Sequence, residues 1–427
     1  MFWNCKKVSK FTCSLALKVR GIYQRGLNRL FTFVGLSTPL FKDVPSLIVG
    51  TLVKESASDG DNDKQDSPLL HPRSRCRDSD QLYLEDESGR VALQVDNVHE
   101  YCTGIVVGVK GAVDKNGILP VEEMYTPEPK AHAKLQAPSL QSSGGSQAPH
   151  LLLVSGLRCG DADVSSLPRD MLLAYLQGHF TPDAQKVCRV IICGGGPSSA
   201  PTTNGSMSSS TFGVRELDTW GLQLGATGIP VDILPGKLDP TTANWPQRPF
   251  HSSLFPKSKS TGLWNHSPNP YAAGHGPRLV IGTDGENVHD LCHSMLAKVK
   301  ESEITKDSPS DDSHDNVQER SSYIPISELE ALKKTLEWAH MCPTGPDSVP
   351  TIPHPEMDPM VLDTTPHVYF AGNATEFATD LVTNDEAGTS TRVVCVPNFA
   401  DTGAAVLVNL ETLGVEVLRF EDDCNSR

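Results

Sequence analysis

Long hydrophobic runs are missing from this sequence of 427 residues. No apolar stretch approaches the roughly 20 residues that a membrane-spanning helix needs, so we expect no association with a membrane. Cysteine pairs are missing as well, because the 11 cysteines are scattered and none shows the Cys-x-x-Cys spacing of a zinc site. We therefore expect a reduced, intracellular protein with no metal ion and no other cofactor.

Common catalytic motifs are also missing. The three glycines at 194–196 follow an apolar run but lack the Lys-Ser/Thr of a phosphate-binding loop, and no Gly-x-Ser-x-Gly nucleophile elbow occurs. These absences exclude a nucleotide-hydrolysing P-loop domain and a serine hydrolase of the α/β type.

Basic residues are scarce except at the N-terminus. Residues 1–42 carry eight basic side chains and no acidic one, so the overall net charge of −15 leaves −23 for the rest of the chain. A body this acidic is a poor generic binder of phosphate groups. We interpret residues 1–44 as a basic N-terminal arm, with an organelle transit peptide as the alternative.

Residues 45–129 show the pattern of a small β-barrel. Five short runs rich in β-branched residues alternate with glycine-containing turns, and a polar insertion interrupts them near 55–66. Barrels of the OB type that grip single-stranded nucleic acid need aromatic platforms and a positive groove. This segment has only Tyr83, Tyr101 and Tyr125, and 16 acidic residues against eight basic ones, which favours a barrel that packs against protein.

The remainder reads as one larger mixed domain. Residues 130–149 have the composition of a linker, and residues 150–420 alternate buried strands with helices before a set of closing strands, which we expect to form one antiparallel sheet. Residues 197–211 read as a serine-rich loop, residues 301–322 as an acidic disordered insertion, and residues 421–427 as a tail.

Five strand ends in this domain follow the order in which calcineurin-like metallophosphoesterases place their metal ligands. A two-metal site of that kind needs clustered histidines and carboxylates. The side chains found instead make a degenerate set, in which only Asp239 can still ligate a metal and Lys237 would add a positive charge. The positions are Ser155, Leu157, Gly195, Lys237, Leu238, Asp239, Thr283, Asn373 and Thr375.

Several signatures recur in the order found in one protein family. They include Leu84-Glu85-Asp86-Glu87, the run from Val231 to Thr241, Pro343-Thr344-Gly345-Pro346-Asp347 and the run from Pro366 to Asn373. From about Pro45 to Phe420 the chain resembles the B-subunit family of replicative DNA polymerases, most closely its delta branch. The resemblance implies a mixed α+β fold: an OB-type barrel followed by a calcineurin-like phosphoesterase β-sandwich flanked by helices, with the metal ligands lost.

The resemblance also implies a function. It predicts a nuclear, non-catalytic scaffold that joins the C-terminal cysteine-rich, metal-binding module of the polymerase delta catalytic subunit to a third accessory subunit, with DNA contacted only within the holoenzyme. Three alternatives stay open: an active metal-dependent phosphohydrolase or exonuclease, a B subunit of polymerase alpha or epsilon, and a free single-strand-binding barrel.

Overall fold

The computed structural model divides the chain into two compact units. Unit 1 comprises residues 1–128, 289–348 and 353–361, and unit 2 comprises residues 129–288, 349–352 and 362–427. The structure describes residues 32–33, 46–56, 73–86, 89–127, 131–132, 148–180, 186–197, 208–298, 323–352, 358–385 and 387–420. Most of the predicted arm and of the linker, and all of the segments 301–322 and 421–427, lie outside the described residues.

Unit 1 is built on a β-sheet. In β3 (Asp80–Glu85), Leu82 and Leu84 are fully buried while their neighbours are partly exposed, as period-two alternation requires of a barrel wall. The sheet order is β6-β4-β3-β2-β5-β7, with a short β1 beside β2. The other strands are β1 (Thr32–Phe33), β2 (Ser46–Ser56), β4 (Arg90–Gln94), β5 (Val106–Gly111), β6 (Ile118–Pro120) and β7 (Glu123–Tyr125).

A second part of unit 1 comes from much later in the chain. It contains the hairpin of β14 (Leu296–Lys298) and β15 (Tyr323–Pro325), and α6 (Glu328–Glu337), whose first turn is capped by Ser327 Oγ accepting from Glu330 N at 3.2 Å. This part is hydrogen-bonded to the segment before β3, since Arg75 N donates to His293 O at 2.7 Å. This division differs from the predicted single domain 150–420, because residues 289–348 contact the barrel.

The described strands of unit 2 form two β-sheets. The six-stranded sheet has the order β11-β10-β9-β8-β19-β20, in which β8 to β11 run parallel and β19 pairs antiparallel with both neighbours. Its strands are β8 (His150–Val154), β9 (Val187–Cys193), β10 (Val231–Leu234), β11 (Trp264–His266), β19 (Ala404–Asn409) and β20 (Val415–Arg419). The five-stranded sheet has the order β12-β13-β16-β18-β17, with β12 (Tyr271–His275), β13 (Arg278–Thr283), β16 (Val368–Ala374), β17 (Ala378–Asn384) and β18 (Thr389–Pro397).

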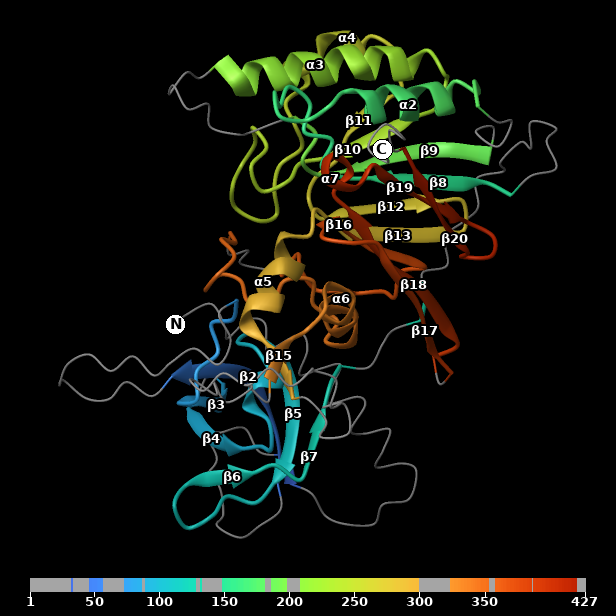
Figure 1. The fold of residues 1–427 in the computed structure, drawn as a ribbon. Helices are drawn as coiled ribbons and strands as arrows, with labels where there is room; N and C mark the ends of the chain where they lie inside the picture. Colours follow the sequence, from blue (N-terminus) through green and yellow to red (C-terminus); the bar gives the residue numbers. More distant parts are fainter. Residues whose placement is uncertain are drawn as a thin grey trace, which may run out of the picture. The chain divides into compact units, whose positions relative to one another are not determined.

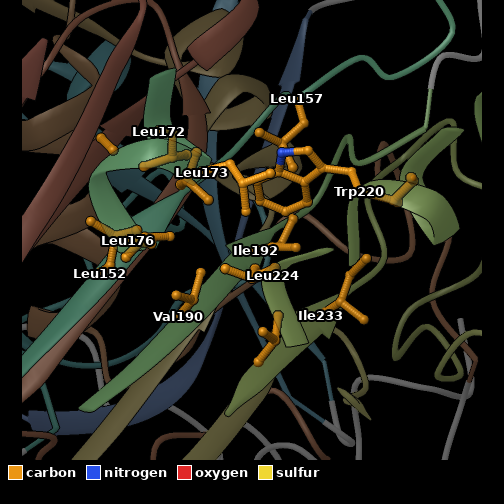
Figure 2. Close-up of a cluster of buried hydrophobic side chains, with 14 of the residues drawn as sticks. Leu152, Leu157, Leu172, Leu173, Leu176, Val190, Ile192, Trp220, Leu224 and Ile233 are labelled. Atoms are coloured by element: carbon orange, nitrogen blue, oxygen red, sulfur yellow. The ribbon is translucent and has the colours of Figure 1, made fainter. Parts of the chain in front are cut away.

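Both faces of the six-stranded sheet are covered (Figure 1). Along β8, Leu151 and Leu153 belong to the core shared with the five-stranded sheet, whereas Leu152 and Val154 belong to the core under the helices. Those helices are α2 (Leu167–Leu176) and α3 (Ser208–Gly225). Figure 2 shows Trp220 of α3 over this core, and its Nε1 donates to Arg169 O at 3.3 Å. Burial on both faces explains why β8 is a continuous apolar run.

Two expectations about local structure are wrong. The closing strands form no single antiparallel sheet, because β18 lies parallel to β16 in one sheet while β19 and β20 complete the other. The serine-rich loop predicted for 197–211 is too long at its end, because α3 begins at Ser208, and residues 198–207 lie outside the described residues. The remaining elements are α4 (Pro256–Lys259), α5 (Glu286–Ser294), α7 (Phe399–Thr402), η1 (Val98–Glu100) and η3 (Ser252–Leu254). None of the helices in the described part of the chain combines the length and the apolar character that crossing a membrane would require.

Candidate functional site

The predicted strand ends of unit 2 do meet. Ser155 follows β8, Gly195 follows β9, Asp239 follows β10, Asp284 follows β13, and Asn373 lies near the end of β16. We call these five residues the strand-end cluster. Strands that share sheets and direction deliver their carboxyl ends to one edge, which is why residues far apart in sequence gather here.

Asp239 is a buried carboxylate held by backbone amides. It is 7% exposed, and its Oδ2 accepts from Gly236 N at 2.7 Å and from Gly195 N at 3.0 Å. Burial raises the pKa of Asp239 to about 7, because these hydrogen bonds only partly offset the loss of solvation and the charge of Asp284 adds to the rise.

Asp284 is a second carboxylate, which the sequence analysis missed. It is 3% exposed, its Oδ1 accepts from Asn269 Nδ2 at 2.8 Å, and its Oδ2 accepts from Lys237 N at 2.9 Å. Burial raises the pKa of Asp284 to about 6. The expectation that Asp239 is the only surviving carboxylate is therefore wrong. The sequence does carry a signal for Asp284, which follows an apolar strand directly and is adjacent to the predicted position Thr283.

Asn373, near the end of β16, is hydrogen-bonded to residues at the ends of β8 and β13. Its backbone N donates to Ser155 Oγ at 2.9 Å, and its Nδ2 donates to Asp284 O at 3.0 Å. Ser155 Oγ in turn donates to Pro397 O at 2.9 Å. Asn373 has φ of 50°, in the left-handed region that asparagine tolerates better than most residues. These contacts give the Asn373 amide and the Ser155 hydroxyl a structural role.

Gly195 leaves little room for a ligand side chain. A Cβ at this position would lie 3.0 Å from Asn373 Oδ1 and 3.0 Å from Gly156 Cα, and the backbone has φ of 66°. An aspartate at 195 would therefore need the neighbouring loops to move.

The other predicted positions point elsewhere. Leu157 is fully buried in the core under the helices, whereas Leu238 is 72% exposed and Thr375 is exposed. Thr283 is buried, and its Oγ1 donates to Asn287 Oδ1 at 2.8 Å at the start of α5.

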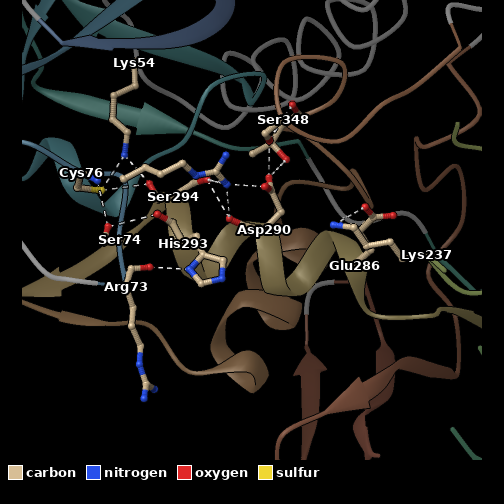
Figure 3. Close-up of polar contacts among 12 residues, drawn as sticks. Lys54, Arg73, Ser74, Cys76, Lys237, Glu286, Asp290, His293, Ser294 and Ser348 are labelled. Atoms are coloured by element: carbon tan, nitrogen blue, oxygen red, sulfur yellow. Dashed lines mark hydrogen bonds and ion pairs between the residues drawn. The ribbon is translucent and has the colours of Figure 1, made fainter. Parts of the chain in front are cut away.

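Lys237 does not bring its charge into the strand-end cluster. Its Nζ lies 3.1 Å from Glu286 Oε1, as Figure 3 shows, and its side chain is 67% exposed. Trp245 Nε1 donates to the other oxygen of Glu286 at 2.9 Å. The expectation that Lys237 enters the cluster is wrong, because its backbone N rather than its ammonium meets Asp284.

Comparisons with known proteins identify the family. Residues 151–379 match the family model of the B subunits of DNA polymerases alpha and epsilon, and residues 39–124 match "DNA polymerase delta subunit OB-fold domain". The chain is similar to DNA polymerase delta subunit 2 of Drosophila melanogaster, with 32% identity over 401 residues that cover 90% of this chain and 84% of the relative. The DNA polymerase delta small subunit of Oryza sativa is 29% identical, over 88% of this chain and 83% of the relative. The DNA polymerase delta small subunit of Saccharomyces cerevisiae is also 29% identical, over 80% of this chain and 71% of the relative.

The second match agrees with the barrel described for unit 1, and the first covers more than half of the chain. The resemblance predicted from the sequence is confirmed, and the chain belongs to the B-subunit family of DNA polymerases alpha and epsilon, within which its named relatives are delta small subunits.

Proposed function

We propose that this chain is the small, non-catalytic subunit of DNA polymerase delta and serves as a scaffold for the catalytic subunit. One observation carries the non-catalytic part of the proposal: the strand-end cluster is occupied by its own hydrogen bonds and contains no histidine. The relatives that are named delta small subunits support the assignment to delta.

The cluster does not fit a pair of divalent cations. Such ions need several oxygen or nitrogen donors each, and phosphoesterases of the two-metal type supply them from one cluster. Here Asp239 Oδ2 already accepts two backbone N–H groups, and each oxygen of Asp284 accepts an N–H of its own. Two carboxylates with no histidine beside them therefore supply too few donors for two such ions. We therefore interpret unit 2 as a phosphoesterase-like domain that has lost its metal ligands.

The barrel offers little to single-stranded DNA. The guanidinium of Arg90 lies 3.7 Å from the ring centre of Tyr83 and covers one face of the ring, and the hydroxyl of Tyr125 donates to Glu123. Stacking a base needs a free aromatic face, and the acidic excess of residues 45–129 repels the phosphates. We expect DNA contact only within the assembled polymerase.

The partner we propose is the catalytic subunit of polymerase delta, held through its C-terminal cysteine-rich module, with a third accessory subunit on the same scaffold in the nucleus. Interfaces that persist throughout the life of a complex are commonly large and apolar. The chain should therefore occur chiefly in the complex.

Affinity purification of the full tagged chain, followed by mass spectrometry, tests the assignment. We expect the delta catalytic subunit in near-equal amount. Recovery of the alpha or epsilon catalytic subunit in its place would move the chain to a sister branch of the family.

An assay of the purified complex with a nitrophenyl phosphodiester in manganese tests the non-catalytic reading. We expect no turnover that depends on the strand-end cluster. Turnover that disappears in both Asp239→Asn and Asp284→Asn would instead establish the metal-dependent hydrolase.

A further inference from the structure

Unit 1 contains a group of three side chains of types that can bind a metal ion, and none of the three belongs to the strand-end cluster. Cys76 and Asp80 lie just before and at the start of β3, and His99 lies in the short helix η1. Their ligand atoms are all within 4.8 Å of one another. Among the residues that the structure describes, this is the one group of three or more such side chains at this spacing.

The three side chains are all withdrawn from solvent. Cys76 is 1% exposed, His99 is 7% exposed, and the side chain of Asp80 is 4% exposed. Buried groups of these types are costly unless they are paired or bind a metal ion.

One nitrogen of the set has no hydrogen-bond partner. His99 Nδ1 is buried and makes no hydrogen bond, and the nearest carboxylate oxygen, Asp80 Oδ2, lies 3.7 Å away. That gap is too long for a hydrogen bond, but a tetrahedral zinc ion holds its nitrogen and oxygen ligands roughly 3.4 Å apart. A buried polar atom without a partner calls for an explanation such as an ion.

We propose that Cys76, Asp80 and His99 bind one zinc ion in unit 1. Thiolate, imidazole and carboxylate are the three side-chain ligands that zinc takes in proteins. The two anionic ligands balance the charge of the dication. On binding, the Cys76 thiol and any protonated His99 release their protons to solvent, and the sulfur and Nδ1 each donate a lone pair to the metal.

The surroundings of the ligands fit this role. Ser56 Oγ donates to Asp80 Oδ1 at 2.6 Å and Arg77 N donates to Asp80 Oδ2 at 3.0 Å, which orients the carboxylate. Lys54 Nζ lies 3.4 Å from Cys76 Sγ and donates to Ser294 O at 2.6 Å, as Figure 3 shows.

A cavity borders the ligand set at Asp80. It has a volume of about 250 Å³, and Lys54, Ser56, Asp80, Cys102 and Thr103 are among the residues that line it. Asp80 thus belongs both to the ligand set and to the cavity wall. A water molecule from this cavity supplies the fourth ligand.

The sequence pattern predicted no metal site because it contains no pair of closely spaced cysteines. The ligands here follow a Cys-x3-Asp-x18-His spacing, and only folding of the loop before β3 onto η1 brings them together. The proposal does not rest on the polymerase assignment.

Equilibrium dialysis of the purified full chain against zinc, with metal analysis, tests the site. We expect one zinc per chain, and cobalt as a substitute should show a thiolate-to-metal charge-transfer band. Cys76→Ser should abolish that band, and Asp80→Asn should weaken binding by more than about tenfold. Cys188→Ser removes an exposed thiol outside the set and serves as the matched control, together with Asp239→Asn.

A measurement on the wild-type chain keeps the test valid even if a variant folds poorly. Under mildly denaturing conditions that open the buried site, zinc should slow the alkylation of Cys76, and not that of Cys188, as mapped by mass spectrometry. Absence of stoichiometric zinc from the folded wild-type chain, or a charge-transfer band that persists in Cys76→Ser, would overturn the proposal.

Discussion

Replacing Asp239 by asparagine should stabilise unit 2 at neutral and alkaline pH. The folded structure raises the pKa of this carboxyl from 3.8 to about 7, chiefly through burial. The folded state therefore holds the proton more tightly than the unfolded state does. The contribution of the group to stability is greatest below pH 3.8, is lost as the pH rises toward about 7, and stays lost above that.

The magnitude follows from the shift. Each pKa unit corresponds to about 1.4 kcal/mol, so a shift of roughly three units means that ionised Asp239 costs about 4 kcal/mol as an order of magnitude. Asparagine cannot ionise, and its Oδ1 can accept from Gly236 N and Gly195 N as Asp239 Oδ2 does. We expect Asp239→Asn to match the wild type near pH 4 and to exceed its free energy of unfolding by a few kcal/mol at pH 8.

Urea unfolding of the full chain at a series of pH values from 4 to 8 measures this difference. Asp161→Asn is a control of opposite sign, because Arg158 and the Asp163 amide outweigh burial and lower the pKa of Asp161. That variant should lose stability at neutral pH. A stability difference between Asp239→Asn and wild type that does not change with pH would refute the reasoning.

Three further predictions concern packing and the barrel. Ser155→Ala should lower the free energy of unfolding by about 1–3 kcal/mol, because Asn373 N loses its buried acceptor, as denaturant unfolding would measure. Trp220→Ala should cost about 3–5 kcal/mol by the same measurement, since it opens a cavity under α3, whereas Leu222→Ala on the same helix is exposed and should cost little. Tyr83→Ala should leave binding of a labelled single-stranded oligonucleotide unchanged in fluorescence anisotropy, and a clear loss would show that the barrel stacks bases.

Local pattern alone located most of the elements that build the candidate site. The apolar runs that became β8, β9, β10, β13 and β16 each end within a few residues of the predicted position, because burial on both faces demands continuous apolar character. The cap at Ser327 is local in the same way, because it joins residues three positions apart. These features depend on neighbours in the sequence, which is why the sequence predicts them.

What the sequence by itself determined is the family, the order of barrel and sandwich, and the absence of histidine at the strand ends. Tertiary structure decided which side chains meet there. Leu157 packs in the core, and Lys237 pairs with Glu286. Asp284 lies close enough to Asp239 for its charge to raise the pKa of Asp239. It also assigned residues 289–348 to the barrel unit and gathered Cys76, Asp80 and His99. Strand pairing and loop direction bring together residues tens to hundreds of positions apart, and local periodicity carries no information about such contacts.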